Sequence, residues 1–144
     1  VDHLSQLDLS EIQPNPGLAD TLNQLPGRKV IYTNAFTGHT RDVMERIGIT
    51  AHFDAVYDIG DADYVPKPAI ESYRRLCGLH GIDPERAAMV EDISRNLEPA
   101  AELGMTTVWV RTDTHWGKDV TDTDHIDHVT DDLAVWLQNV AKIA

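Results

Sequence analysis

A chain of 144 residues is long enough to bury the core of one domain, and its 42% hydrophobic and 25% charged residues are ordinary for a globular protein. The formal net charge of −12 argues against a nucleic acid or an anionic membrane as partner, because both would repel the chain. No segment approaches the roughly 20 apolar residues of a membrane-spanning helix. No signal peptide is visible and Cys77 is the only cysteine, so we expect a cytoplasmic protein.

The first half of the chain alternates helix and strand patterns. The elements predicted there, in chain order, are a helix over 17–25, a strand over 29–32, a helix over 39–47 and a strand over 53–59. The first of these strands ends at Thr33 and Asn34, and Gly48 is expected to cap the second helix. A polar loop over 60–65 follows.

The second half continues the alternation. The elements predicted there are a helix from Pro68 to Gly81, a strand over 87–92, a helix over 96–103, a strand over 106–110 and a closing helix that bears Leu133, Trp136, Leu137 and Val140. Pro68 suits the first turn of its helix, where no backbone N–H is needed. Thr130 is expected to cap the closing helix, with Asp131 and Asp132 in its first turn. No strand is predicted between residues 111 and 132.

Strands that alternate with helices in this way specify a parallel sheet with right-handed crossovers. The sequence therefore predicts an α/β fold. In such a fold the carboxyl ends of the strands lie along one edge of the sheet, which is where ligands bind.

Polar residues gather at that predicted edge. Thr33 with Asn34 ends one strand, Glu91 with Asp92 ends another, and Lys67 follows a third strand and leads into a helix. A hydroxyl, an ammonium and two carboxylates suit a phosphate and a divalent cation. Hard oxygen ligands favour Mg²⁺, which keeps several waters and borrows oxygens from a phosphate substrate.

Each of these residues also has a purely structural interpretation. Thr33 could end its strand or cap the next helix, and Lys67 alone is most often a solvated charge. Glu91 and Asp92 could merely complement the positive N-terminus of the helix behind them. Asn96 is expected to tie the loop to that helix. The functional interpretation depends on the order in which the residues occur together.

That order resembles the haloacid dehalogenase superfamily, in which a Thr or Ser ends one strand, a Lys precedes a helix and an acidic pair ends a later strand. The matching segments are Ile31-Tyr32-Thr33-Asn34, Pro66-Lys67-Pro68 with Tyr73, Val90-Glu91-Asp92-Ile93-Ser94-Arg95-Asn96-Leu97 and Gly104-Met105-Thr106-Thr107-Val108. Within the superfamily the chain looks most like the pyrimidine 5′-nucleotidase branch, from Pro26-Gly27-Arg28-Lys29 before the strand and His39 after it.

The resemblance implies a three-layer, Rossmann-like parallel sheet and a role for each residue of the predicted edge. Thr33 and Asn34 would bind the substrate, with Thr33 hydrogen-bonding the transferring phosphoryl group. Lys67 would neutralise charge between the nucleophile and the phosphate. Asp92 would bind Mg²⁺, with Glu91 as a second ligand or as the holder of its waters.

The chain departs from the family at the nucleophile. The family begins with a strand that ends in Asp-x-Asp, and no such strand precedes Thr33. Asp122-Thr123-Asp124 has the right residues but no apolar run before it, and Asp2 and Asp8 also lack a preceding strand. We therefore reject these aspartates as the nucleophile.

In the family the missing strand lies at the centre of the sheet, between the strands that match those of Thr33 and Glu91, and the helical cap is inserted after it. We expect residues 1–13 to be the connection returning from that cap and residues 14–144 to be the C-terminal part of the core, incomplete at its central strand.

The sequence thus predicts a protein that hydrolyses phosphomonoesters of small metabolites, such as pyrimidine nucleoside 5′-monophosphates, with Mg²⁺ and through an aspartyl-phosphate formed on an Asp outside this sequence. The chain alone is expected to be inactive. The alternative is a non-catalytic, truncated phosphate- or metal-binding module that pairs with another chain or with itself through the unfilled strand position. Carbon–halogen cleavage is less favoured, because Lys67 and the acidic pair suit a metal and a phosphoryl group.

Overall fold

The structure, a computed structural model, describes residues 9–112 and 122–143. The described residues form two compact units. The first contains residues 9–64 and 134–143, and the second contains residues 65–112 and 122–133. Among the described helices, none is both long enough and apolar enough to cross a membrane.

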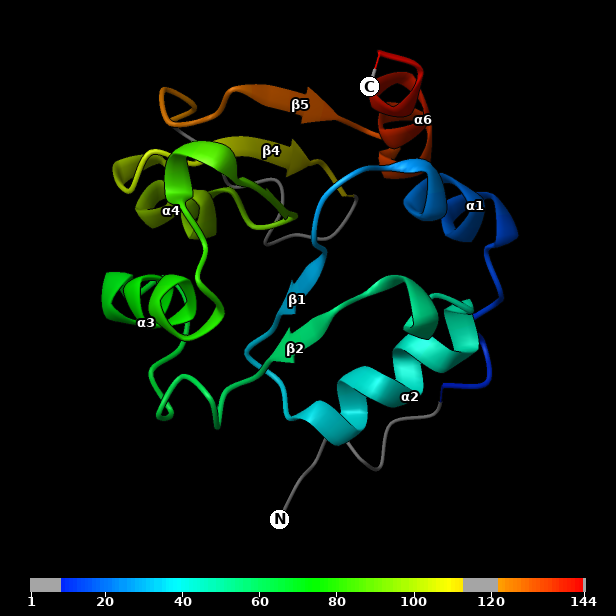
Figure 1. The fold of residues 1–144 in the computed structure, drawn as a ribbon, viewed down its shortest axis with the longest axis horizontal. Coiled ribbons are helices and arrows are strands. Elements are labelled where there is room, and N and C mark those ends of the chain that lie inside the picture. Colours follow the sequence, from blue (N-terminus) through cyan, green and yellow to red (C-terminus); the bar gives the residue numbers. More distant parts are fainter. Residues whose placement is uncertain (1–8, 113–121, 144) are drawn as a thin grey trace. The chain divides into compact units, whose positions relative to one another are not determined.

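The first unit is built on two short parallel strands. Its elements are α1 (Pro16–Gln24), β1 (Val30–Tyr32), α2 (Thr37–Ile47), a 3₁₀ turn (Thr50–His52), β2 (Ala55–Tyr57) and most of α6 (Leu133–Ile143). β1 and β2 lie side by side (Figure 1), with Tyr32 opposite Tyr57 in the register. Because the strands are parallel, the residues after Tyr32 and Tyr57 emerge at the same edge of this sheet.

Helices close the core of the first unit. Leu22 of α1, Met44 of α2 and Ile49 form its buried centre, and Leu137 of α6 packs against them. The two helix boundaries have local causes. The side chain of Asn15 accepts a hydrogen bond from the backbone N–H of Leu18 at 3.1 Å and caps α1, and α2 stops at Gly48, whose φ of 86° is the left-handed conformation that glycine adopts without strain.

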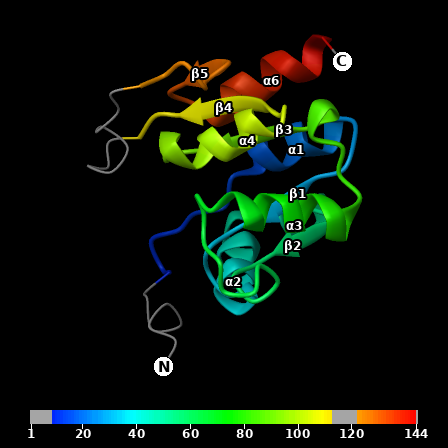
Figure 2. The same ribbon diagram turned by 90° about the vertical axis from the view of Figure 1, so that its left-hand side faces the viewer.

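The second unit carries a three-stranded parallel sheet. Its elements are α3 (Ile70–His80), a 3₁₀ turn (Pro84–Arg86), β3 (Ala88–Glu91), a 3₁₀ turn (Ser94–Leu97), α4 (Glu98–Glu102), β4 (Thr106–Val110) and β5 (His128–Thr130). The strand order is β3-β4-β5, and Glu91 lies opposite Trp109. α4 packs against both α3 and β4 (Figure 2). The largest fully buried side chains here are Tyr73, Leu97, Val108 and Thr107.

The α/β fold class is confirmed, because the structure consists of parallel strands that alternate with helices. The described strands form two sheets, and none of them pairs with both β1 and β3. The missing central strand remains a prediction.

Several predicted boundaries are wrong. The strand expected over 53–59 is only Ala55–Tyr57, because Asp58 turns away to hydrogen-bond the start of α2. Pro68 lies in the turn before α3, which begins at Ile70. The helix expected over 96–103 starts as the 3₁₀ turn Ser94–Leu97 and becomes α-helical only at Glu98.

The region before α6 also differs from the prediction. The strand β5 was not expected, since it is only three residues long and two of these residues are exposed. The hydroxyl of Thr130 does accept a hydrogen bond from the N–H of Asp132, at 3.0 Å. The helix begins only at Leu133, however, so Asp131 and Asp132 precede its first turn, and Asp131 pairs with Arg111 instead.

Candidate functional site

Lys67 and Glu91 form a buried ion pair in the second unit. The Nζ atom of Lys67 lies 2.7 Å from Oε2 of Glu91, and the two side chains are only 9% and 8% exposed. Glu91 is the last residue of β3, and Lys67 reaches it from the turn before α3, 24 positions earlier in the chain. Taking both charges out of water is costly, so their attraction must offset that cost.

The second oxygen of Glu91 is also used. Its Oε1 accepts a hydrogen bond of 3.3 Å from the backbone N–H of Ile93. Burial raises the pKa of Glu91 above its ordinary value, the Lys67 ammonium acts in the opposite direction, and a hydrogen bond with the Asp92 carboxyl raises the pKa further. A carboxyl held in this way serves first as the counter-ion of Lys67.

Asp92 completes a cluster with these two residues. Its carboxyl lies within hydrogen-bonding reach of Glu91, and its backbone carbonyl accepts a hydrogen bond of 3.0 Å from the indole of Trp109. The structure therefore brings together three of the predicted site residues, Lys67, Glu91 and Asp92, at the carboxyl end of β3. The two adjacent carboxyls can carry one more negative charge than the single ammonium neutralises, so the cluster can attract a further cation.

Thr33 and Asn34 belong to the first unit. Thr33 follows β1, its backbone N–H donates to the carbonyl of Tyr57 at 3.0 Å, and its hydroxyl accepts from the N–H of Ala35 at 3.0 Å. Asn34 is exposed. Both residues thus lie at the carboxyl edge of the β1–β2 sheet, where the sequence predicts them.

Asp58, which the sequence analysis placed inside a strand, organises that edge. One oxygen of its carboxylate accepts hydrogen bonds from the backbone N–H and the hydroxyl of Thr37, at 3.0 and 2.5 Å, and the other accepts from the N–H of Asp61 at 2.8 Å. Asp58 therefore caps α2 from the position directly after β2 and restrains the loop between Thr33 and Thr37. The only signal in the sequence was a charged residue near the end of the strand predicted over 53–59.

A comparison with families decides the relationship of this chain to known proteins. A family model described as a haloacid dehalogenase-like hydrolase matches residues 3–104. The chain belongs to the haloacid dehalogenase-like hydrolase family.

Solved structures of this fold include both dehalogenases and phosphatases. An L-2-haloacid dehalogenase from Xanthobacter autotrophicus is 21% identical with a TM-score of 0.70, over 92% of this chain and 62% of its own. A predicted phosphoglycolate phosphatase from Haemophilus somnus is 22% identical with a TM-score of 0.69, over 89% and 56%. A phosphatase of the family from Thermococcus onnurineus is 22% identical with a TM-score of 0.65, over 89% and 54%. The chain thus spans less than two thirds of these structures, and at such identities the likeness concerns the fold.

The Asp122-x-Asp124 motif, which we rejected as the nucleophile, lies at the edge of the β3–β4–β5 sheet opposite to that of Glu91. Asp122 accepts a hydrogen bond from the N–H of Asp124 at 2.9 Å, in a turn before β5. β5 runs parallel to β4, so this turn is at the amino end of the strands, opposite Glu91.

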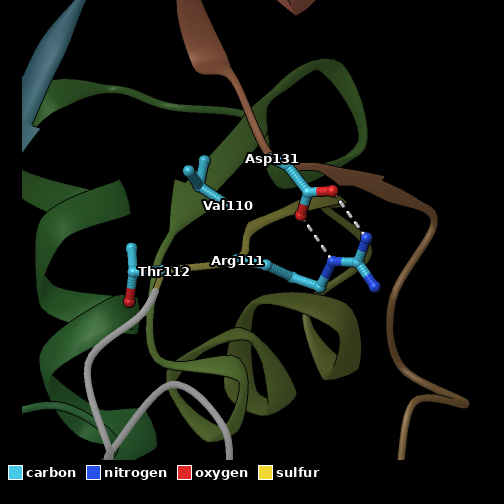
Figure 3. Close-up of a pocket in the computed structure, with 4 residues that line it drawn as sticks. All are labelled: Val110, Arg111, Thr112 and Asp131. Carbon is cyan, nitrogen blue, oxygen red and sulfur yellow. Dashed lines mark hydrogen bonds and ion pairs between the residues drawn. The ribbon is translucent and has the colours of Figure 1, made fainter.

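A pocket of about 530 Å³ lies at the carboxyl ends of β4 and β5 (Figure 3). It is lined by Val110, Arg111, Thr112 and Asp131. The guanidinium of Arg111 faces the carboxylate of Asp131 through two hydrogen bonds of 2.7 Å, which Figure 3 shows as dashed lines. Among the described residues, none of the predicted site residues lines this pocket.

The chemistry of the cluster at the end of β3 fits Mg²⁺. The carboxyl groups of Asp92 and Glu91 supply hard oxygen atoms, and Mg²⁺ commonly binds through one or two carboxylates with the remaining positions filled by water and phosphate. In the parts of the chain that the structure describes, no group of three or more His, Cys, Asp or Glu side chains could hold a metal. Two carboxyls are therefore the most that this cluster offers.

Proposed function

We propose that the parent protein is a Mg²⁺-dependent hydrolase that removes phosphate from small phosphomonoesters. The observation that carries the proposal is the buried Lys67–Glu91 pair beside Asp92, at the carboxyl end of a parallel strand. A fixed ammonium next to carboxyl oxygens provides a place for a phosphate and a place for a divalent cation. The membership of the family supports a hydrolase.

In this proposal each residue of the cluster has a role. Lys67, held by Glu91, neutralises the charge of the phosphate as it transfers. Asp92 is the principal protein ligand of Mg²⁺, and Glu91 is a second ligand or holds its waters. Bound Mg²⁺ supplies charge stabilisation to the phosphoryl oxygens.

The first unit contributes to the same proposal through Thr33 and Asn34. The hydroxyl of Thr33 hydrogen-bonds the transferring phosphoryl group, and Asn34 takes part in substrate binding. The nucleophile is an Asp outside this sequence, which forms an aspartyl-phosphate that water then hydrolyses.

Pyrimidine nucleoside 5′-monophosphates are the substrates that we propose to test first, because the sequence from Pro26 to Asn34 resembles that branch of the superfamily. The test is phosphate release with Mg²⁺ by the chain extended with the upstream residues of its reading frame. Release from these nucleotides, lost on Lys67→Met and on Asp92→Asn, is the expected result. Release from other small phosphomonoesters, but not from these nucleotides, supports the hydrolase activity and contradicts the assignment of nucleotides as substrates. No release from nucleotides and sugar phosphates, with chloride release from 2-chloropropionate, contradicts the proposal.

A separate test needs no activity. Mg²⁺ titrated into the 144-residue chain should bind weakly and should bind more weakly still after Asp92→Asn. Glu102→Gln, which removes an exposed carboxylate from α4, is the matched control and should leave binding unchanged. Equal binding by the chain and by its Asp92→Asn variant contradicts the assignment of Asp92.

One observation favours a second candidate, a non-catalytic module that pairs with another chain. Among the described strands, β1 pairs only with β2, and β3 pairs on one side only, with β4. Strand edges with unpaired N–H and C=O groups bind other strands. Light scattering of the purified chain tests this candidate, since a concentration-independent monomer contradicts pairing with itself.

A further inference from the structure

The segment that follows β3 is held by side chains from three other elements. The indole N–H of Trp109, in β4, donates to the carbonyl of Asp92 at 3.0 Å. Nε2 of His125, in the segment before β5, lies 2.8 Å from the carbonyl of Ser94. The hydroxyl of Tyr73, in α3, donates to the carbonyl of Asn96. Every second carbonyl from Asp92 to Asn96 therefore has a side-chain donor, and the three donors come from different parts of the second unit.

Burial makes the contacts of Tyr73 and Trp109 costly to lose. Tyr73 is fully buried and Trp109 is 8% exposed, so their polar hydrogens depend largely on the carbonyls that they reach. The carbonyls gain in the same way, because Ser94 and Asn96 are buried too. Without these donors the segment would rest on a single short 3₁₀ turn, a conformation with poor hydrogen-bond geometry.

The contact of His125 is itself supported. A carbonyl oxygen can only accept, so Nε2 of His125 must carry the proton. The hydroxyl of fully buried Thr107 donates to the carbonyl of His125 at 2.6 Å, and the N–H of Asp127 donates to the same hydroxyl at 2.9 Å. These hydrogen bonds fix the loop that carries His125 to β4. His125 in turn restrains the Ser94 carbonyl that it contacts.

These contacts converge on Asp92 from both sides. On one side Glu91 is fixed by Lys67, and on the other the Asp92 carbonyl and the residues after it are fixed by the three donors. Two neighbouring carboxylates repel when both are charged, so Asp92 would tend to turn away from Glu91 if its backbone were free. A backbone held on both sides limits the positions that the Asp92 carboxylate can take beside Glu91.

We propose that Trp109, His125 and Tyr73 are positioning residues that hold Asp92 ready for a divalent cation. The inference rests on the proposed function, in which Asp92 binds that cation. Groups that orient a metal ligand from outside the coordination sphere commonly change metal affinity by about 10–100-fold when they are removed.

The test is Mn²⁺ binding to the 144-residue chain, followed by the electron paramagnetic resonance signal of the free ion. Trp109→Phe deletes the indole N–H and keeps an aromatic ring, and it should weaken Mn²⁺ binding about tenfold or more. Trp136→Phe, in α6 of the other unit, is the matched control and should leave binding unchanged. A folded Trp109→Phe chain that binds Mn²⁺ as the wild type does overturns the proposal.

Three further variants serve if Trp109→Phe does not fold. Tyr73→Phe removes a single hydroxyl group, and His125→Ala removes the contact to Ser94, whereas His125→Gln retains an N–H that can donate. Weaker Mn²⁺ binding by the first two and recovery with His125→Gln support the proposal. Unchanged binding in all three overturns it.

A second readout separates this proposal from the proposed function. If neither the wild type nor its Asp92→Asn variant binds Mn²⁺, the proposed function fails, and amide hydrogen exchange over residues 93–97 decides on the positioning. Faster exchange in Trp109→Phe supports the restraint on this segment, and unchanged exchange overturns it.

Discussion

The ammonium of Lys67 and the carboxyl of Glu91 lie 2.7 Å apart with both side chains more than nine-tenths buried, although 24 positions separate them in the chain. A buried pair of this kind stabilises little as a pair, but the removal of one partner leaves the other buried and uncompensated. The stability of the second unit should therefore depend on both residues being present.

The first prediction concerns this pair. Lys67→Met should lower the free energy of unfolding by about 3–5 kcal/mol, because it leaves Glu91 beside Asp92 without its counter-ion. The double variant Lys67→Met/Glu91→Leu should cost less than the sum of the single variants. Urea unfolding followed by circular dichroism measures all three, and strictly additive costs would contradict the coupling.

The second prediction concerns pH. The pKa of Glu91 is raised in the folded state, so above pH 4.5, its ordinary value, the folded chain binds more protons than the unfolded chain. The contribution of Glu91 is then fully present below pH 4.5 and is lost as the pH rises through the folded-state pKa. Glu91→Gln should make the fall in unfolding free energy with rising pH less steep over this range.

The control for that pH profile is Val90→Thr, a non-titrating change at an exposed position of the same strand. It should shift the whole profile without changing its slope. If the slope above pH 4.5 is the same in Glu91→Gln and in the wild type, Glu91 does not titrate differently on folding.

Features with local causes could be predicted from the sequence. Gly48 and Gly81 both end helices in the left-handed conformation, and the strand 106–110 was predicted with its observed bounds, because five successive β-branched or aromatic residues leave little alternative. The placement of Glu91 and Asp92 at the end of a strand was predictable for the same reason, since an apolar run stops there.

Features with non-local causes could not be predicted from the sequence. β5 has only three residues, two of them exposed beside the half-buried Thr130, and its strand conformation depends on pairing with β4. The sequence placed Lys67 and Glu91 at one edge but gave no sign that they pair, and it did not show that Trp109 would reach the Asp92 carbonyl. Such contacts depend on how the elements pack against one another, which the spacing of apolar residues along the chain does not reveal.

The third prediction concerns Asp58, which caps α2 through Thr37. Asp58→Ala should lower the free energy of unfolding by about 1 kcal/mol, the usual cost of a lost N-cap. Amide exchange in residues 37–40 should also become faster, because the first turn of α2 loses its acceptor. Asp42→Asn, an exposed change on the same helix, is the control and should do neither.

The contribution of Asp58 to stability should change with pH in the direction opposite to that of Glu91. Burial alone would raise its pKa, but the hydrogen bonds from Thr37, Asp61 and Gly60 lower it on balance below the ordinary 3.8. Its contribution is therefore present above pH 3.8 and is lost as the pH falls through the folded-state pKa. The stability difference between wild type and Asp58→Ala should shrink on acidification, and a constant difference down to the acid transition would contradict this linkage.

The fourth prediction concerns Arg111 and Asp131, whose side chains are 54% and 68% exposed. Their two hydrogen bonds of 2.7 Å match the Lys67–Glu91 pair in length, and the Arg111 guanidinium lowers the pKa of Asp131. Water already solvates both groups, however, so Arg111→Met leaves no buried charge behind. The urea midpoint of Arg111→Met should stay close to that of the wild type and far above that of Lys67→Met. The small effect that remains should vanish in 1 M salt, where the screening length is about 3 Å. A loss as large as that of Lys67→Met would show that geometry, and not burial, decides what an ion pair contributes in this fold.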